Sequence, residues 1–286
     1  MPAKFIDVLR DSAVTSLSFE FFPPKTPEGM GNLELAFNQL LELSPTFASV
    51  TYGAGGSNQE TSLAVVENFA PRLDTVAHLT CIGSSRLNVL NLLARYESVG
   101  VAGLLALRGD LPAGSTEAPI SDFKYAIELL ELAAVESDLS VGVSAFPEKH
   151  PESADLAWDI AILKRKQDAG AEYAITQLFF DIEAYRTLVL DARNAGVTIP
   201  IIPGVMPISN AKQVLRMAEM SGAKMPLRLY DQLSGANSDE SARAIGMDFS
   251  ANFTQELIDM NAPGVHIFTL NHSQAATELA KAVGLA

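Results

Sequence analysis

A carboxylate stands inside an aromatic run near the start of the chain. Glu20 lies in "SLSFEFFPPK" (16–25), beside Phe19, Phe21 and Phe22 and just before two prolines. Aromatic rings exclude water and raise the pKa of a carboxyl group, which suits a general acid that works near neutral pH. The alternative is a structural one, in which Glu20 lies at the rim of a strand with its charged head in water.

Polar residues also stand at or just beyond the ends of later apolar runs. They combine acids, amides, hydroxyls, imidazoles and a guanidinium: Thr51, His78, Thr80, Arg108, Asp110, Glu148, His150, Gln177 and Asn271. Some have a structural alternative: His78 could be a core histidine bonded to a backbone carbonyl, and Arg108 and Asp110 could pair across the turn at Gly109. Gln177 lies inside "AITQLFFD", and burying an amide without partners costs about 1–3 kcal/mol, so we expect it to have a specific role.

The elements that carry these residues alternate along the whole chain. Eight short apolar runs read as strands, at 15–22, 46–53, 75–82, 101–108, 139–146, 172–179, 198–205 and 264–271. Stretches between them, such as 33–43, 122–135, 153–170 and 210–220, have helical periodicity. This alternation predicts parallel strands joined by helices, and eight such units predict a closed (β/α)8 barrel.

The longer interval between the seventh and eighth runs predicts extra helices around 225–240, and we expect a single barrel domain over 1–286 because no linker interrupts the pattern. An open doubly wound sheet is the main rival. However, "YGAGGS" (52–57) lacks the full dinucleotide fingerprint, and there is no phosphate-binding P-loop. In a barrel, active sites form where the strands end, so the polar residues above would converge on one rim. That convergence favours Glu20 as a site carboxylate.

Composition excludes several classes of partner. The 34 acidic against 20 basic residues give a net charge of −14, which is unsuited to nucleic acid or anionic lipid. No run approaches the roughly 18 apolar residues of a membrane span, and no signal peptide is recognisable, so we expect a cytoplasmic protein. The one cysteine, Cys81, reads as a small core residue. No histidine pair has metal-ligand spacing, so we expect no metal. No strand end supplies the lysine that a Schiff-base enzyme would need.

Eight ordered blocks resemble a known family. "SFEFFPPK", "SVTYGAGGS", "HLTCIG", "ALRGDLP", "FPEKHPE", "LKRKQDAGAEYAITQLFFD", "IPGVMPIS" and "TLN" are similar, in order and spacing, to the bacterial 5,10-methylenetetrahydrofolate reductases. The resemblance covers essentially the whole chain. It implies a (β/α)8 barrel with noncovalent FAD at the strand ends, reduced by NADH and reoxidised by methylenetetrahydrofolate in a ping-pong cycle. The product would be 5-methyltetrahydrofolate, which supplies methyl groups for methionine synthesis.

The resemblance also implies roles for single residues. Glu20 would be the general acid that opens the methylene bridge of the substrate. Asp110 would lie near flavin and pterin, where its charge stabilises a developing cation. Gln177 would read the pterin edge with its amide. The residues implied for flavin binding are Thr51, His78, Arg108, Gly109, Asp110, Tyr125, Ala126, His150, Asp159, Arg165 and Lys166. The cations in this set suit a pyrophosphate.

Several positions depart from the family pattern. Gln59, Glu60, Thr61 and Ser62 replace an Arg-Asp-Arg-Thr-like run, and Phe146 replaces a tyrosine; the remaining departures are Ile127, Glu128, Ile162, Phe268 and His272. These changes would weaken cofactor or folate affinity without altering the fold. Two alternatives therefore stay open: hydride transfer directly from the nicotinamide to the same substrate, and a folate- or flavin-binding paralogue without catalysis. The family also suggests a homo-oligomer.

Overall fold

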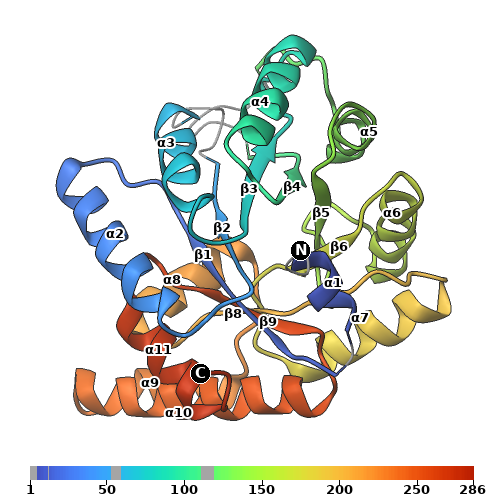
Figure 1. Cartoon of the computed structure of the whole chain (residues 1–286). Coiled ribbons are helices and arrows are strands. Elements are labelled where there is room, and N and C mark those ends of the chain that lie inside the picture. Colours follow the sequence, from blue (N-terminus) through green and yellow to red (C-terminus); the bar gives the residue numbers. More distant parts are fainter. Residues whose placement is uncertain (1–4, 12, 53–58, 111–118) are drawn as a thin grey trace.

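The computed structural model describes residues 5–11, 13–52, 59–110 and 119–286 (Figure 1). Its strands form one parallel sheet with the order β7-β6-β5-β4-β3-β2-β1-β9-β8. The strands are β1 (Ser16–Phe21), β2 (Phe47–Val50), β3 (Thr75–Thr80), β4 (Gly103–Leu107), β5 (Ser140–Ala145), β6 (Tyr173–Thr176), β7 (Ile201–Ile202), β8 (Gly204–Val205) and β9 (Gly264–Phe268).

The sheet closes through an interrupted seventh strand. β7 pairs with β6, whereas β8 pairs with β9. Only Pro203 separates β7 from β8, and its carbonyl oxygen accepts a hydrogen bond of 3.0 Å from the His266 amide. Proline has no N–H to donate to the ladder, so it divides this strand into two short pieces. The nine strands therefore correspond to eight barrel positions, and the predicted (β/α)8 fold is confirmed.

Helices surround the sheet (Figure 1). They are α1 (Phe5–Arg10), α2 (Pro27–Leu41), α3 (Gln59–Phe69), α4 (Arg86–Ser98), α5 (Ala126–Glu136), α6 (Leu156–Asp168), α7 (Ile182–Asn194), α8 (Ala211–Ser221), α9 (Leu227–Ser234), α10 (Asp239–Asp259) and α11 (Ser273–Ala282). Of these, α8, α9 and α10 lie between β8 and β9 in the chain. None of the helices in the described ranges is long and apolar enough to cross a membrane.

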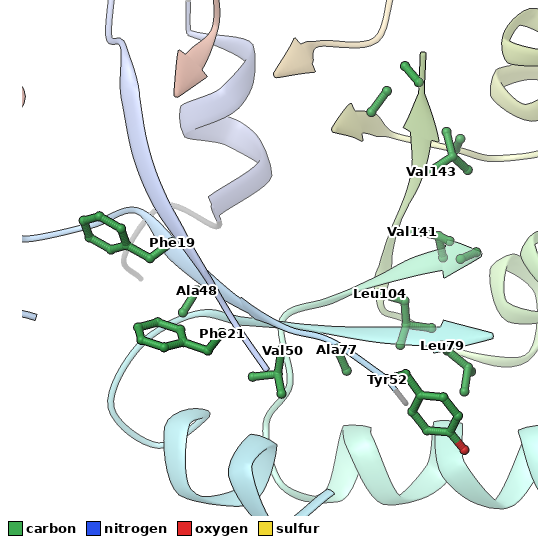
Figure 2. Close-up of a cluster of buried hydrophobic side chains, with 14 of the residues drawn as sticks. Phe19, Phe21, Ala48, Val50, Tyr52, Ala77, Leu79, Leu104, Val141 and Val143 are labelled. Carbon is green, nitrogen blue, oxygen red and sulfur yellow. The ribbon is translucent and has the colours of Figure 1, made fainter. Parts of the chain in front are cut away.

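The outer face of the sheet is apolar and packs against the helices. Figure 2 shows part of this layer, which includes Phe19 and Phe21 of β1. The Phe21 ring meets the edges of Phe37 from α2 and Phe69 from α3, at centroid distances of 5.7 and 5.3 Å. Because successive side chains of a strand point to opposite faces, Glu20 between these two phenylalanines faces the barrel interior.

The interior is apolar at the end where the strands begin. Phe5 of α1 packs there against Phe47 at 5.3 Å and against Tyr173 at 5.5 Å between ring centroids. The Tyr173 hydroxyl donates to Leu104 O at 2.7 Å. Its ring needs the space beside Gly142, where an added Cβ would lie only 2.2 Å from a ring carbon. Helix α1 thus closes this end, and the polar interior side chains lie further along the strands.

Candidate functional site

Four neighbouring strands bring polar side chains together in the barrel interior. The parallel register places Ser18 beside His266 of β9, and Glu20 beside Ser49 of β2. Glu20 Oε2 lies 3.6 Å from His78 Nε2 and 3.7 Å from His266 Nε2. The Glu20 side chain keeps 22% of its surface exposed, whereas His78 and His266 are buried. One carboxylate therefore lies between two imidazoles and reaches toward solvent.

The surroundings of Glu20 differ from the sequence prediction. Phe19 and Phe21 point to the helices, so these two rings do not enclose the carboxylate. Burial acts most strongly and raises the pKa of Glu20, but the interaction with His266 and the charges of both histidines outweigh it. The pKa of Glu20 consequently lies below its ordinary value, and the expectation of a raised pKa was wrong. The reason is the period-two geometry of the strand, which separates neighbours in sequence onto opposite faces.

His266 was missed by the sequence analysis. Its Nδ1 lies 2.8 Å from Ser18 Oγ, and its Nε2 lies 3.2 Å from Ser49 Oγ. The ring also stacks on Phe47 with a centroid distance of 5.6 Å. The available signal was a histidine in the middle of "GVHIF", where every other residue except glycine is apolar. Such a polar residue inside a buried strand needs partners, and here two serines provide them.

Two buried polar atoms of β3 have no hydrogen-bond partner among the described residues. They are His78 Nε2 and Thr80 Oγ1. Burial lowers the pKa of His78 to about 4, although the Glu20 carboxylate acts in the opposite direction, so the ring is neutral at pH 7. An unpartnered buried polar atom costs about 1–3 kcal/mol, and a bound polar ligand would remove that cost.

The segment after β4 contributes Arg108, Gly109 and Asp110. The Arg108 guanidinium forms a bidentate ion pair with Glu152 at 2.6 and 3.0 Å. Its partner is therefore Glu152 and not Asp110, which was the structural alternative considered from the sequence. Gly109 has φ of +86°, and a Cβ there would lie 2.7 Å from Ile82 Cγ2. Only glycine fits this close, left-handed turn. It leads directly to Asp110, which is exposed.

The loop between β5 and α6 is tied to three neighbours. The His150 amide donates to Asp159 Oδ2 at 2.6 Å, and Ser153 Oγ donates to the other oxygen of the same carboxylate. Glu148 Oε2 accepts a bond of 2.9 Å from the Lys224 amide, in the connection between α8 and α9. Together with the Arg108 pair, these bonds hold the loop between β4, α6 and the α8–α9 connection.

The remaining predicted cofactor residues lie on β2, α5 and α6. Thr51 directly follows β2 and is half-buried. Tyr125 directly precedes α5 and is half exposed, and Ala126 is the first residue of α5. Asp159 lies in the first turn of α6, whereas Arg165 and Lys166 lie in its last turn. Burial lowers the pKa of Lys166, while the Asp159 carboxylate acts in the opposite direction.

Comparison with known proteins places this chain. A family model for methylenetetrahydrofolate reductase matches residues 4–284. The chain belongs to the methylenetetrahydrofolate reductase family. It is 34% identical over 273 residues to the 5,10-methylenetetrahydrofolate reductase of Salmonella typhimurium, covering 94% of this chain and 91% of that protein. The resemblance inferred from the sequence blocks is thereby confirmed.

Two further matches differ in kind, one being a sequence relative and the other a solved structure. Methylenetetrahydrofolate reductase (NADH) 1 of Arabidopsis thaliana is 34% identical over 301 residues, which cover 99% of this chain but 51% of the longer plant protein. Among solved structures, an uncharacterized Clostridium thermocellum protein that binds two copies of 5-methyl-5,6,7,8-tetrahydrofolic acid matches with a TM-score of 0.64 and 14% identity. That alignment covers 99% of this chain and 95% of the other. This second likeness shows a shared fold.

Within the family frame, two rim residues differ from expectation. Gln177 lies just past the end of β6 and is exposed, so it is not the buried amide that the sequence predicted. The Asn271 amide is buried and serves the backbone, because it accepts from Phe22 N at 3.0 Å and donates to Phe22 O at 2.8 Å. Asn271 therefore fixes the segment after β1 that follows Glu20.

The departures from the family pattern have local structural partners. Ser62 Oγ donates to Thr51 O at 3.1 Å. The Glu128 carboxylate accepts from the Tyr125 amide at 3.1 Å and caps the first turn of α5. Phe146 places its ring edgewise on His150, with centroids 4.8 Å apart. The glycine-rich turn at 53–57 lies outside the described residues.

Proposed function

We propose that this protein reduces 5,10-methylenetetrahydrofolate to 5-methyltetrahydrofolate with NADH as the electron donor and FAD as the cofactor. The observation that carries this proposal is the Glu20 carboxylate, held 3.6 and 3.7 Å from two imidazoles at the strand ends of a barrel that belongs to this family. We further propose a cytoplasmic homo-oligomer that uses no nucleic acid, membrane or metal.

In this proposal Glu20 delivers a proton to the substrate. The methylene bridge joins two nitrogens of the folate, N5 and N10. A proton placed on N10 weakens its bond to the bridge carbon, and the electron pair of that bond remains on N10 as it leaves. The carbon stays on N5 as an electrophilic iminium, which becomes a methyl group when it accepts hydride. Glu20 reaches the solvent-exposed mouth and is placed for this proton transfer.

Several of the residues assigned to flavin binding suit this cofactor chemically. The unpartnered His78 Nε2 and Thr80 Oγ1 offer polar contacts, and the left-handed turn at Gly109 leads to the exposed Asp110. Arg108, Arg165 and Lys166 provide positive charge suited to a pyrophosphate. Bound FAD would carry hydride between NADH and the folate. The other residues assigned to this binding are Thr51, Asp110, Tyr125, Ala126, His150 and Asp159.

Two exposed residues would contact or act on the folate. Asp110 would place a negative charge near the developing iminium cation, which lowers the energy of the charged transition state. Gln177 would use its amide as both donor and acceptor on the pterin edge. Its exposure at the end of β6 leaves this amide accessible to a ligand.

The test is spectroscopic. We expect the purified protein to show flavin absorbance after addition of FAD, to lose it with NADH in the absence of oxygen, and to regain it with methylenetetrahydrofolate. In Glu20→Gln, bleaching by NADH should persist and recovery with the folate should be lost. Full folate turnover in that variant would refute the general-acid role.

A second candidate is reduction of the same substrate by direct hydride transfer from the nicotinamide. Phe146 and Ile162 favour it, because both replace polar groups at the proposed cofactor site with apolar side chains. A colourless protein that ignores FAD yet oxidises NADH when given the folate would support this candidate. A protein that binds the folate without turnover would instead be a paralogue without catalysis.

A further inference from the structure

His266 is fully buried and is not used in the mechanism above. Its ring has three oxygen neighbours: Ser18 Oγ at 2.8 Å, Ser49 Oγ at 3.2 Å and Glu20 Oε2 at 3.7 Å. A buried imidazole in direct reach of a carboxylate can hold a proton that the carboxylate later uses. Its arrangement therefore bears on where the proton for the reaction resides.

The serine on β1 fixes the tautomer of this ring. Ser18 Oγ lies 3.4 Å from Val265 O and 2.8 Å from His266 Nδ1; we assign its proton to the carbonyl, which leaves Oγ to accept from Nδ1–H. The neutral ring then carries its proton on Nδ1 and presents the lone pair of Nε2 toward Ser49 and Glu20. A second proton can bind only at Nε2, on the side that faces Glu20.

We propose that His266 and Glu20 share one proton, and that His266 supplies it to Glu20 when Glu20 protonates the folate. This inference rests on the proposed function. The step is balanced: the Nε2–H bond of His266 breaks as an O–H bond forms on Glu20, and that O–H bond breaks as the N10–H bond of the folate forms. The imidazolium becomes neutral imidazole. Solvent at the exposed side of Glu20 restores the proton after product leaves.

A proton held on His266 explains how Glu20 can act as an acid although its own pKa is low. A general acid must carry a proton near neutral pH, yet the two histidines hold the pKa of Glu20 below its ordinary value. If the resting proton lies on His266, the carboxylate is charged before the folate binds. Binding of the folate then excludes water, which disfavours the separated ion pair and drives the proton onto Glu20. The atoms are 3.7 Å apart and would move closer in the bound state.

The groups facing this pair are few. His78 of β3 approaches Glu20 from the other side and is neutral at pH 7 because burial lowers its pKa to about 4. Phe47 stacks on His266 at 5.6 Å, and Phe268 meets it edgewise at 5.8 Å between ring centroids. Among the described residues, His78 is the one further titratable side chain within ion-pair distance of Glu20, so His266 is the remaining proton carrier.

The test compares pH profiles of kcat/KM for the folate. His266→Gln keeps a polar side chain but cannot carry the second proton, and a histidine holds its proton to a pH about two units higher than a carboxyl does. We therefore expect the basic limb of the profile to move by about one to two pH units toward lower pH. On that limb, at pH 8, the rate should fall by about tenfold to hundredfold. If His266 had only a structural role, His266→Gln would lower kcat/KM at all pH values and would leave the pH of the basic limb unchanged.

Two serine variants separate the relay from general disruption. Ser18→Ala removes the acceptor for Nδ1–H and should lower the folate rate by about twofold to tenfold. Ser16→Ala is the matched control, because Ser16 lies on the same strand and its buried hydroxyl has no partner among the described residues. We expect that control to behave as the parent protein. Equal losses in both serine variants would overturn the relay.

A second readout does not depend on turnover. Nitrogen-15 NMR of labelled histidines should show less imidazolium at His266 in Glu20→Gln than in the parent protein at the same pH, because the shared proton needs the Glu20 carboxylate. If His266 titrates identically in both proteins, the shared proton does not exist, whether or not the protein reduces folate. If the NMR difference is present but the parent protein fails to reduce folate, the proposed function fails and the proton pair stands.

Discussion

The Glu152 carboxylate binds the Arg108 guanidinium, which the flavin pyrophosphate would also need to contact. The pair is bidentate, at 2.6 and 3.0 Å, but its side chains are 38% and 65% exposed. Replacing Glu152 by glutamine removes the charge that competes with the phosphate and keeps the shape of the side chain. We expect FAD to bind more tightly to Glu152→Gln, because Arg108 would no longer exchange one anion for another.

The size of the effect follows from the exposure of the pair. An exposed ion pair contributes about 0.2–1 kcal/mol, which corresponds to about a 1.4-fold to fivefold decrease in the Kd for FAD. The hydrogen bond to Arg108 lowers the pKa of Glu152, so the carboxylate is charged at neutral pH and competes there. The difference between the two proteins should shrink at high salt, where exposed charges are screened.

The assay is titration of the apoprotein with FAD, followed by quenching of flavin fluorescence. Glu183→Gln is the matched control, because Glu183 is also 65% exposed and pairs with Arg186 on α7, outside the proposed site. It should bind FAD as the parent protein does. Weaker binding in Glu152→Gln alone would refute competition and would mean that Glu152 instead orients Arg108 for the cofactor.

Further predictions concern folate chemistry, packing and pH. Asp110→Asn should weaken folate binding and slow the folate half-reaction in stopped-flow measurements, and unchanged kinetics would refute its electrostatic role. Gly142→Ala should lower the free energy of unfolding in urea by about 1–3 kcal/mol, because the new methyl would lie 2.2 Å from the Tyr173 ring, whereas Gly31→Ala on α2 meets nothing within 4 Å and should not destabilise. Burial lowers the pKa of His78 from 6.5 to about 4, so the unfolded chain binds more protons between these values and stability should fall as pH decreases through this window. The fall should be shallower in His78→Gln, as measured by urea midpoints across pH.

The fold could be predicted because each barrel unit repeats the same pattern of apolar run and amphipathic helix. Even the break in the seventh strand has a visible cause, since Pro203 stands in the middle of its run. The partner of Arg108 was not predictable in the same way. Glu152 lies 44 residues further along the chain, and only the folded loop brings the two side chains together.

Gln177 shows where reasoning from runs of residues fails. The run "EYAITQLF" suggested a strand that contains the glutamine, but β6 ends at Thr176. Phe179 and Phe180 beyond it are buried, although they lie outside the strand. Apolar residues of a packed loop therefore extended the apparent strand and made an exposed amide look buried. The end of a strand is set by its pairing with neighbours, which a single sequence does not contain.

The site itself depends on register more than on any one strand. Alternation along β1 requires Ser18 and Glu20 to share a face, and this could be read from the sequence. It could not be read that Ser18 pairs with His266, since the two residues lie 248 positions apart. Shifting β9 by one residue would turn His266 out to the helices and leave Glu20 with His78 alone. The register between β1 and β9 therefore decides whether His266 lies next to Glu20 as a proton donor. This register exists only once the barrel closes.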